Sequence, residues 1–181
     1  LIMSLIGEVK FDKNTIFVLA IANNEEMAEA LLNSVFKGLS KVGSEEWTTQ
    51  YGDFNIRCFT KYPDCDIHRR TPPFADITLG QCNVGEEKDS DVLNYLSCRA
   101  DSKHMLLIDS NLQRKVQKQV TVLGSASDVL PILDKYTQEL KDRNTQYSEM
   151  EDTDLLNNRK KFNNTRKTHD IYNDEKIKAV R

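Results

Sequence analysis

Glycine, proline and cysteine are all scarce in this 181-residue sequence, which contains seven glycines, four prolines and four cysteines. No apolar run approaches the roughly 18 residues that a membrane-spanning helix needs. The N-terminal segment LIMSLIGEV is too short and too weakly flanked to resemble a secretory signal. Positive charge is not in excess, because the formal net charge is −3. We therefore expect no membrane partner and no overall bias toward nucleic acid.

The cysteines form no CxxC pair. Zinc-ribbon sites present their ligands as close pairs, whereas Cys58, Cys65, Cys82 and Cys98 are widely spaced. A metal site assembled in space from the first three and His68 is an alternative that this spacing does not favour. We predict no metal site and free thiols in a reducing compartment, which indicates an intracellular protein, cytoplasmic or nuclear.

Catalytic signatures are also missing. No G-x-S-x-G nucleophile elbow and no D-x-D-x-D-G calcium loop is present. Asp64 with Asp66, or Glu86 with Glu87 and Asp89, could bind a cation, but solvated loops produce the same pattern. A His/Cys arrangement that meets only in space stays open. We predict a protein that is not an enzyme, with no catalytic residue and no cofactor.

Residues 15–37 are the most informative part of the chain. The run at 15–21 is β-branched and aliphatic, as in a central strand buried on both faces. Asn23 or Asn24 then caps a helix, with Glu25 and Glu26 in its first turn. We expect the buried stripe of this helix to consist of residues at helical spacing: Met27, Ala30, Leu31, Ser34 and Val35.

The rest of the chain alternates between strand and helix signals. A Gly52-Asp53 turn predicts a hairpin, and the chain then continues through strands and helices in alternation. This order predicts an α/β fold: a mostly parallel sheet with helices on both faces and one antiparallel edge hairpin. The expected strands are 46–51, 54–62, 74–84, 104–109 and 121–123, and the expected helices are 91–98, 112–119 and 128–141.

The composition changes near residue 142. Beyond it leucine and valine become rare, while Asn, Asp, Lys and Arg dominate. We predict an α/β domain over residues 1–141 and a charged C-terminal extension over 142–181, either helical or disordered. Its apolar residues keep no heptad, so a long coiled coil is not expected.

The element order resembles that of small GTPases, which also carry one antiparallel edge strand beside a parallel sheet. Ser125-Ala126 before the last helix is similar to the final loop of that fold. The functional motifs are missing, because G-x-x-x-x-G-K-[ST] has no counterpart in residues 21–26. A D-x-x-G segment is replaced by Asp76 and Gly80 with one residue too many between them. The chain thus resembles a pseudo-GTPase, and residues 15–37 are similar to the centromere protein M family.

That resemblance implies a non-catalytic protein-interaction or scaffold subunit in a larger complex, of a chromatin or kinetochore type. No functional residue is transferred from the family. Candidate partner-binding residues come instead from exposed loops, the hairpin and the tail: Trp47, Tyr62, Arg69, Arg70 and Phe162.

Two other functions stay open. A flavodoxin-like or Rossmann-like enzyme or nucleotide binder would use polar residues at the strand ends, namely Asn23, Asn24, Cys82, Asn83 and Asp109. A nucleic-acid-associated factor would use the basic residues at 159–167, although the acidic residues at 149–154 weaken this reading.

Overall fold

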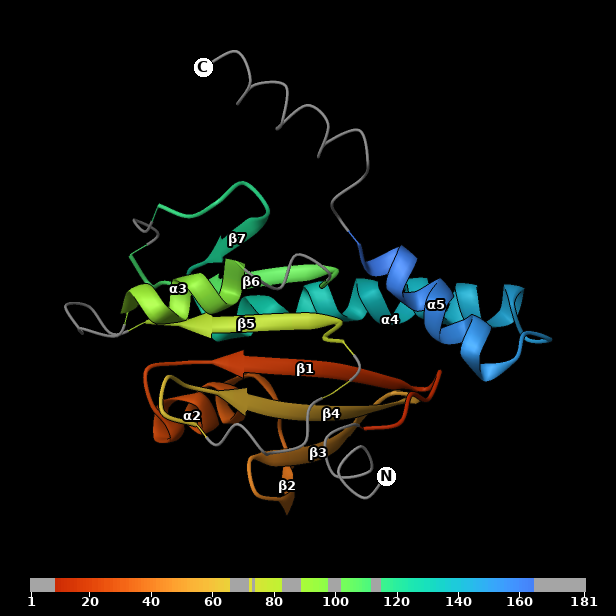
Figure 1. Cartoon of the computed structure of the whole chain (residues 1–181), viewed down its shortest axis with the longest axis horizontal. Helices are drawn as coiled ribbons and strands as arrows, with labels where there is room; N and C mark the ends of the chain where they lie inside the picture. Colours follow the sequence, from red (N-terminus) through yellow and green to blue (C-terminus); the bar gives the residue numbers. More distant parts are fainter. Residues whose placement is uncertain are drawn as a thin grey trace, which may run out of the picture.

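A seven-stranded mixed sheet forms the centre of the protein (Figure 1), in the order β2-β3-β4-β1-β5-β6-β7. The computed structural model describes residues 9–65, 72, 74–82, 89–97, 102–111 and 115–164. The strands are β1 (Thr15–Ile21), β2 (Ser40–Gly43), β3 (Glu46–Tyr51), β4 (Phe54–Lys61), β5 (Ile77–Gln81), β6 (His104–Ile108) and β7 (Val120–Leu123). The helices are α2 (Glu25–Val35), α3 (Asp89–Ser97), α4 (Val129–Gln146) and α5 (Asp152–Asn163), with a 3₁₀ turn at Ala126–Asp128.

The pairing of the strands confirms the predicted fold class. β4, β1, β5, β6 and β7 are parallel to one another, whereas β3 runs antiparallel to β4. Gly52 closes the β3–β4 hairpin with φ of +58°, a left-handed conformation that glycine adopts without strain. The antiparallel edge is one strand longer than predicted, because β2 pairs outside β3 with an irregular register near Gly43.

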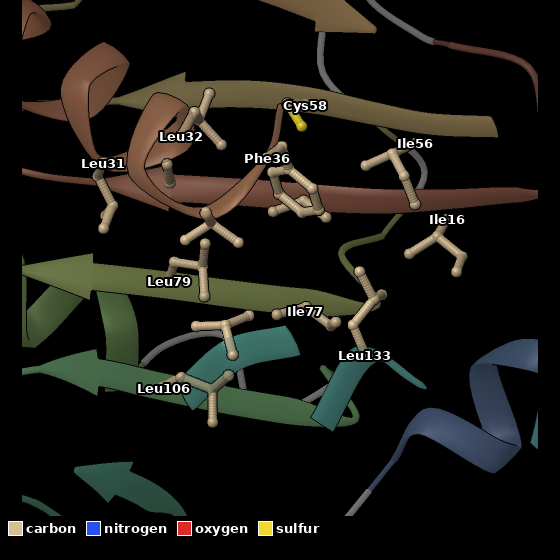
Figure 2. Packing of buried hydrophobic residues seen from close by; sticks show 14 of the residues in the cluster. Ile16, Leu31, Leu32, Phe36, Ile56, Cys58, Ile77, Leu79, Leu106 and Leu133 are labelled. Carbon is tan, nitrogen blue, oxygen red and sulfur yellow. The ribbon is translucent and has the colours of Figure 1, made fainter. Parts of the chain in front are cut away.

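Two hydrophobic clusters cover the two faces of the sheet. On one face, α2 and α4 pack over Ile16, Val18 and other inward residues of the central strands (Figure 2). On the opposite face, α3 contributes Val92 and Leu96 to a cluster around Phe17. β1 is therefore buried on both faces along its whole length, as its unbroken apolar sequence predicts.

Helix α2 begins where the sequence predicts but turns a different face to the sheet. Its buried residues are Ala28, Leu31, Leu32 and Val35, whereas Ala30 and Ser34 are exposed. The predicted stripe was therefore wrong at these two positions. The core takes up both leucines of the consecutive pair, Leu31 and Leu32, so the buried face is shifted toward Ala28 and Leu32 and away from Ala30 and Ser34.

Two predicted elements differ from the structure. The helix expected at 112–119 is absent from 115–119, which forms an irregular segment and a turn; residues 112–114 lie outside the described part. The strand expected at 74–84 is shorter, since β5 covers only Ile77–Gln81 and residues 83 and 84 are not described. Polar residues inside both segments, among them Asp76 and Lys115, interrupt the apolar periodicity that would fix their limits.

The C-terminal part of the described chain belongs to the same fold. The boundary expected between residues 141 and 142 falls inside α4, and α5 packs at the amino ends of the parallel strands (Figure 1). Phe162 of α5 packs against one hydrophobic cluster and Leu156 against the other. Residues 165–181 lie outside the described part. None of the described helices is long and apolar enough to cross a membrane.

Candidate functional site

The turn after β1 is the place where an α/β nucleotide-binding domain holds phosphate. Here its residues are tied to the protein itself. The Ala22 amide donates to the Lys61 carbonyl at 3.2 Å. The Asn23 side chain is buried, with 5% exposure, and its Nδ2 donates to Asp89 Oδ1 at 2.9 Å. The first turn of the sheet is thereby joined to the start of α3.

The N-terminus of α2 is capped by a side chain of the protein itself. Asn24 caps the helix, and its Oδ1 accepts from the Met27 amide at 3.0 Å. Glu25 and Glu26 follow in the first turn, where negative charge interacts favourably with the helix dipole. A phosphate at this position would find the Met27 amide already bonded to Asn24. It would also face two carboxylates, whose repulsion is on the order of kilocalories per mole.

The other strand-end residues predicted to line a crevice are only partly brought together. Cys82 Sγ lies 3.8 Å from the Asp89 carbonyl oxygen, so Cys82 and Asn23 meet at the same residue. Asp109 instead accepts a hydrogen bond from the Asn111 amide at 3.2 Å, within its own turn. Asn83 lies outside the described residues. Asn23 and Asp89, both nearly inaccessible, fill the space between the ends of β1 and α3 with side chains.

A second polar cluster lies at the opposite end of the sheet, where sequence analysis did not expect one. Asp76 precedes β5 and is fully buried. Its Oδ1 lies 3.2 Å from Arg159 Nη1 of α5, and its Oδ2 accepts from the Phe17 amide at 2.7 Å. Arg159, only 4% exposed, also donates to the carbonyls of Thr15 and Lys13 at 3.0 and 2.8 Å.

Tyr136 and Asn163 complete this cluster. Tyr136 donates to Asp76 Oδ1 at 2.5 Å, and Asn163 Nδ2 donates to the same oxygen at 2.8 Å. Burial, followed by the charge of Asp76, raises the pKa of Tyr136 well above its ordinary value, so the phenol keeps its proton. Since every member is buried, no substrate can reach the cluster, and it holds α4 and α5 to the sheet.

Sequence reasoning missed this cluster for a physical reason. Asp76 and Arg159 lie 83 residues apart and belong to a loop and to a charged segment. In the sequence Asp76 resembled a remnant of the D-x-x-G motif. The structure places it at the amino end of β5, whereas GTPase-type ligands bind at carboxyl ends.

The predicted partner-binding residues occupy different environments. Trp47 lies on β3, between β2 and β4, and is buried with 3% exposure, so β3 is not the edge strand that we expected. Tyr62 is half-buried and donates to the Glu45 carboxylate. Phe162 is half-buried and stacks on Tyr136, with ring centroids 6.2 Å apart. Arg69 and Arg70 lie outside the described residues. The three described residues come from β3, the segment after β4 and α5, and none of them is exposed.

His104, at the start of β6, makes stability depend on pH. Burial and the nearby charges of Lys103 and Lys135 lower its pKa to about 4, and its ring packs edge-on against Tyr136. Because the folded pKa lies below the ordinary 6.5, the unfolded chain takes up the proton first. We therefore expect His104 to reduce stability as pH falls from about 6.5 toward 4.

The variant His104→Phe keeps an aromatic ring against Tyr136 but cannot titrate. Its free energy of unfolding should fall less between pH 7.5 and pH 5 than that of the unaltered chain, measured by urea denaturation at both pH values. Parallel losses in the two proteins would show that His104 does not contribute to the pH dependence.

Neither the metal-binding side chains of the described residues nor similarity to known proteins indicates a function. The described residues contain no group of three or more His, Cys, Asp or Glu side chains arranged to hold a metal ion. The chain matches no protein-family model, and no curated protein matches it in sequence.

Proposed function

We propose that this chain is a non-catalytic protein-interaction or scaffold subunit, built on a GTPase-like α/β fold that has lost its nucleotide site. The turn between β1 and α2 supports this proposal most directly. The Met27 amide is capped by Asn24, the Asn23 side chain is bonded to Asp89, and Glu25 and Glu26 occupy the first turn of the helix. These contacts stabilise the turn in the absence of a ligand.

The fold supports the same proposal. A parallel sheet with an antiparallel edge, and a Ser125 cap before the 3₁₀ turn that leads into α4, are the features on which the resemblance to small GTPases rests. Within that group the centromere protein M family suggests a role in a chromatin or kinetochore-type assembly. This role places the protein inside the cell, in the nucleus or the cytoplasm, with protein partners.

The two alternatives gain less support. An enzyme or nucleotide binder of another α/β type needs an accessible crevice, whereas Asn23 and Asp89 are 5% and 7% exposed. A nucleic-acid factor needs the basic residues of the tail on the surface. Lys160 and Lys161 are exposed, but Arg159 is buried against Asp76.

Calorimetric titration with GTP and ATP in the presence of Mg²⁺ tests the lost nucleotide site. We expect no saturable heat up to about 1 mM nucleotide, which corresponds to a binding free energy weaker than about 4 kcal/mol. The double variant Glu25→Gln/Glu26→Gln keeps the Asn24 cap and removes both charges. We expect it to remain silent as well, since the amide cradle and the lysine are still missing.

Micromolar binding by the unaltered chain would overturn the proposal. Binding by the Gln variant alone would show that charge, and not the shape of the turn, excludes phosphate. A complementary observation is co-purification of the tagged chain from native extract. The proposal predicts a protein partner at stoichiometric yield.

A further inference from the structure

The link between β6 and β7 joins two parallel strands with no helix among its described residues, as does the link between β4 and β5. Parallel neighbours need a crossover connection, which is usually an α-helix that covers the sheet face. The crossover from β1 to β4 contains α2, and that from β5 to β6 contains α3. In the link from β6 to β7, the described residues 109–111 and 115–119 contain no helix.

A hollow lies beside this link. It has a volume of about 290 Å³. The apolar residues that line it come from α3, the link and β7: Leu93, Leu96, Val116 and Val120. All four also belong to, or pack against, the hydrophobic cluster on the α3 face of the sheet. The hollow is therefore an open continuation of that core, in the region where a crossover helix would pack.

The rim of the hollow is polar and basic. Asn94 and Gln117 provide amides, and Lys115 is the charged side chain among the described residues that line it. Lys115 and the neighbouring Lys118 are exposed. No acidic residue is among the described lining residues, so an incoming negative charge would meet attraction here.

We propose that this hollow, the α3–β7 groove, binds an amphipathic helix of a protein partner that carries apolar residues at i, i+3/i+4 spacing and an acidic residue opposite Lys115. The geometry favours a helix over a strand. An added strand would pair with the backbone at the outer edge of β7, whereas the groove opens on the sheet face between α3 and the link. The partner's helix would take the place of a crossover helix, which the described residues of the link do not form. This inference rests on the proposed function, because it names one surface of the interaction subunit.

A designed peptide provides a direct test with the full-length chain. The probe is a fluorescein-labelled helix of about 18 residues, with leucine on one face and glutamate elsewhere, and the comparison is its scrambled sequence. We expect saturable binding of the helical probe in fluorescence anisotropy, and at least tenfold weaker binding of the scrambled one. Leu93→Asp should weaken binding at least tenfold, because it places a carboxylate in the apolar lining.

Matched variants separate the groove from general surface effects. Val42→Asp alters an exposed apolar residue on β2, and we expect it to leave binding unchanged. Lys115→Glu is on the rim, where folding is least disturbed. It should weaken binding of the acidic probe severalfold, and a probe with lysine in place of glutamate opposite position 115 should restore it.

Several outcomes would overturn the proposal. The first is the absence of saturable binding, and the second is a scrambled probe that binds as tightly as the helical one. The third is that the Leu93→Asp and Lys115→Glu variants both bind the helical probe as tightly as the unaltered chain does. Self-association in sedimentation that Leu93→Asp abolishes would identify a second copy as the occupant instead. If a native partner co-purifies equally well with Leu93→Asp, the groove is refuted while the proposed function stands. Nucleotide binding in calorimetry would refute the proposed function itself.

Discussion

Replacing Asp76 with alanine is expected to lower the free energy of unfolding by about 3–5 kcal/mol, a cost typical of breaking a buried ion pair by removing one partner. The Asp76 side chain is fully buried and lies 3.2 Å from Arg159. Without it, the guanidinium stays buried beside backbone carbonyls with no negative charge. The Phe17 amide also loses its side-chain acceptor, and the Tyr136 hydroxyl keeps only the Asn163 side-chain oxygen. Since the free energy of unfolding of a whole domain is about 5–15 kcal/mol, the expected loss is a large fraction of the total stability.

A double-mutant cycle tests this prediction. Urea denaturation of Asp76→Ala, Arg159→Met and the double variant should show that the double variant loses less than the sum of the single losses, because neither charge is then left unpaired. Asp128→Ala is the matched control. Asp128 is exposed and makes no side-chain capping bond, so its loss should stay within about 0.5 kcal/mol. A loss below about 1 kcal/mol for Asp76→Ala would contradict the structure of this cluster.

The sequence predicts best where local signals agree. β1, β3 and β6 begin at the residues that the sequence predicts, Thr15, Glu46 and His104, and Gly52-Asp53 marks the hairpin turn between β3 and β4. In each case the strand pattern and its turn chemistry indicate the same boundary. The start of α2 follows from the same agreement, because the Asn23-Asn24 pair and the acidic first turn coincide, and the structure identifies Asn24 as the cap.

The failures come from tertiary contacts. β2 has four exposed residues and no apolar alternation, so only its pairing with β3 identifies it as a strand. Residues 115–119 have enough helix formers to predict a helix, but packing beside α3 determines their conformation instead. From the sequence alone Arg159 is expected to be a surface charge, because a single sequence gives no sign that Asp76 lies opposite it.

Ending the chain after residue 150 is expected to destabilise the fold by at least the cost of losing Arg159, about 3–5 kcal/mol. The reference is a chain that ends after residue 164, so the two proteins differ only in residues 151–164. The truncation removes α5. Asp76 then keeps its buried charge without Arg159, and Tyr136 loses the ring of Phe162 that stacks on it. Thermal unfolding followed by circular dichroism should show a Tm lower by more than about 6 °C.

The same truncation with Asp76→Asn tests the reason for this loss. Asparagine keeps the size of the side chain and an oxygen for the Phe17 amide, but it carries no charge. If the unpaired carboxylate causes the loss, Asp76→Asn should destabilise the chain ending at 164 and partly restore the stability of the chain ending at 150. Equal Tm values for the two chains without the substitution would instead place α5 outside the cooperative unit. The cooperative unit would then end before residue 151, after α4.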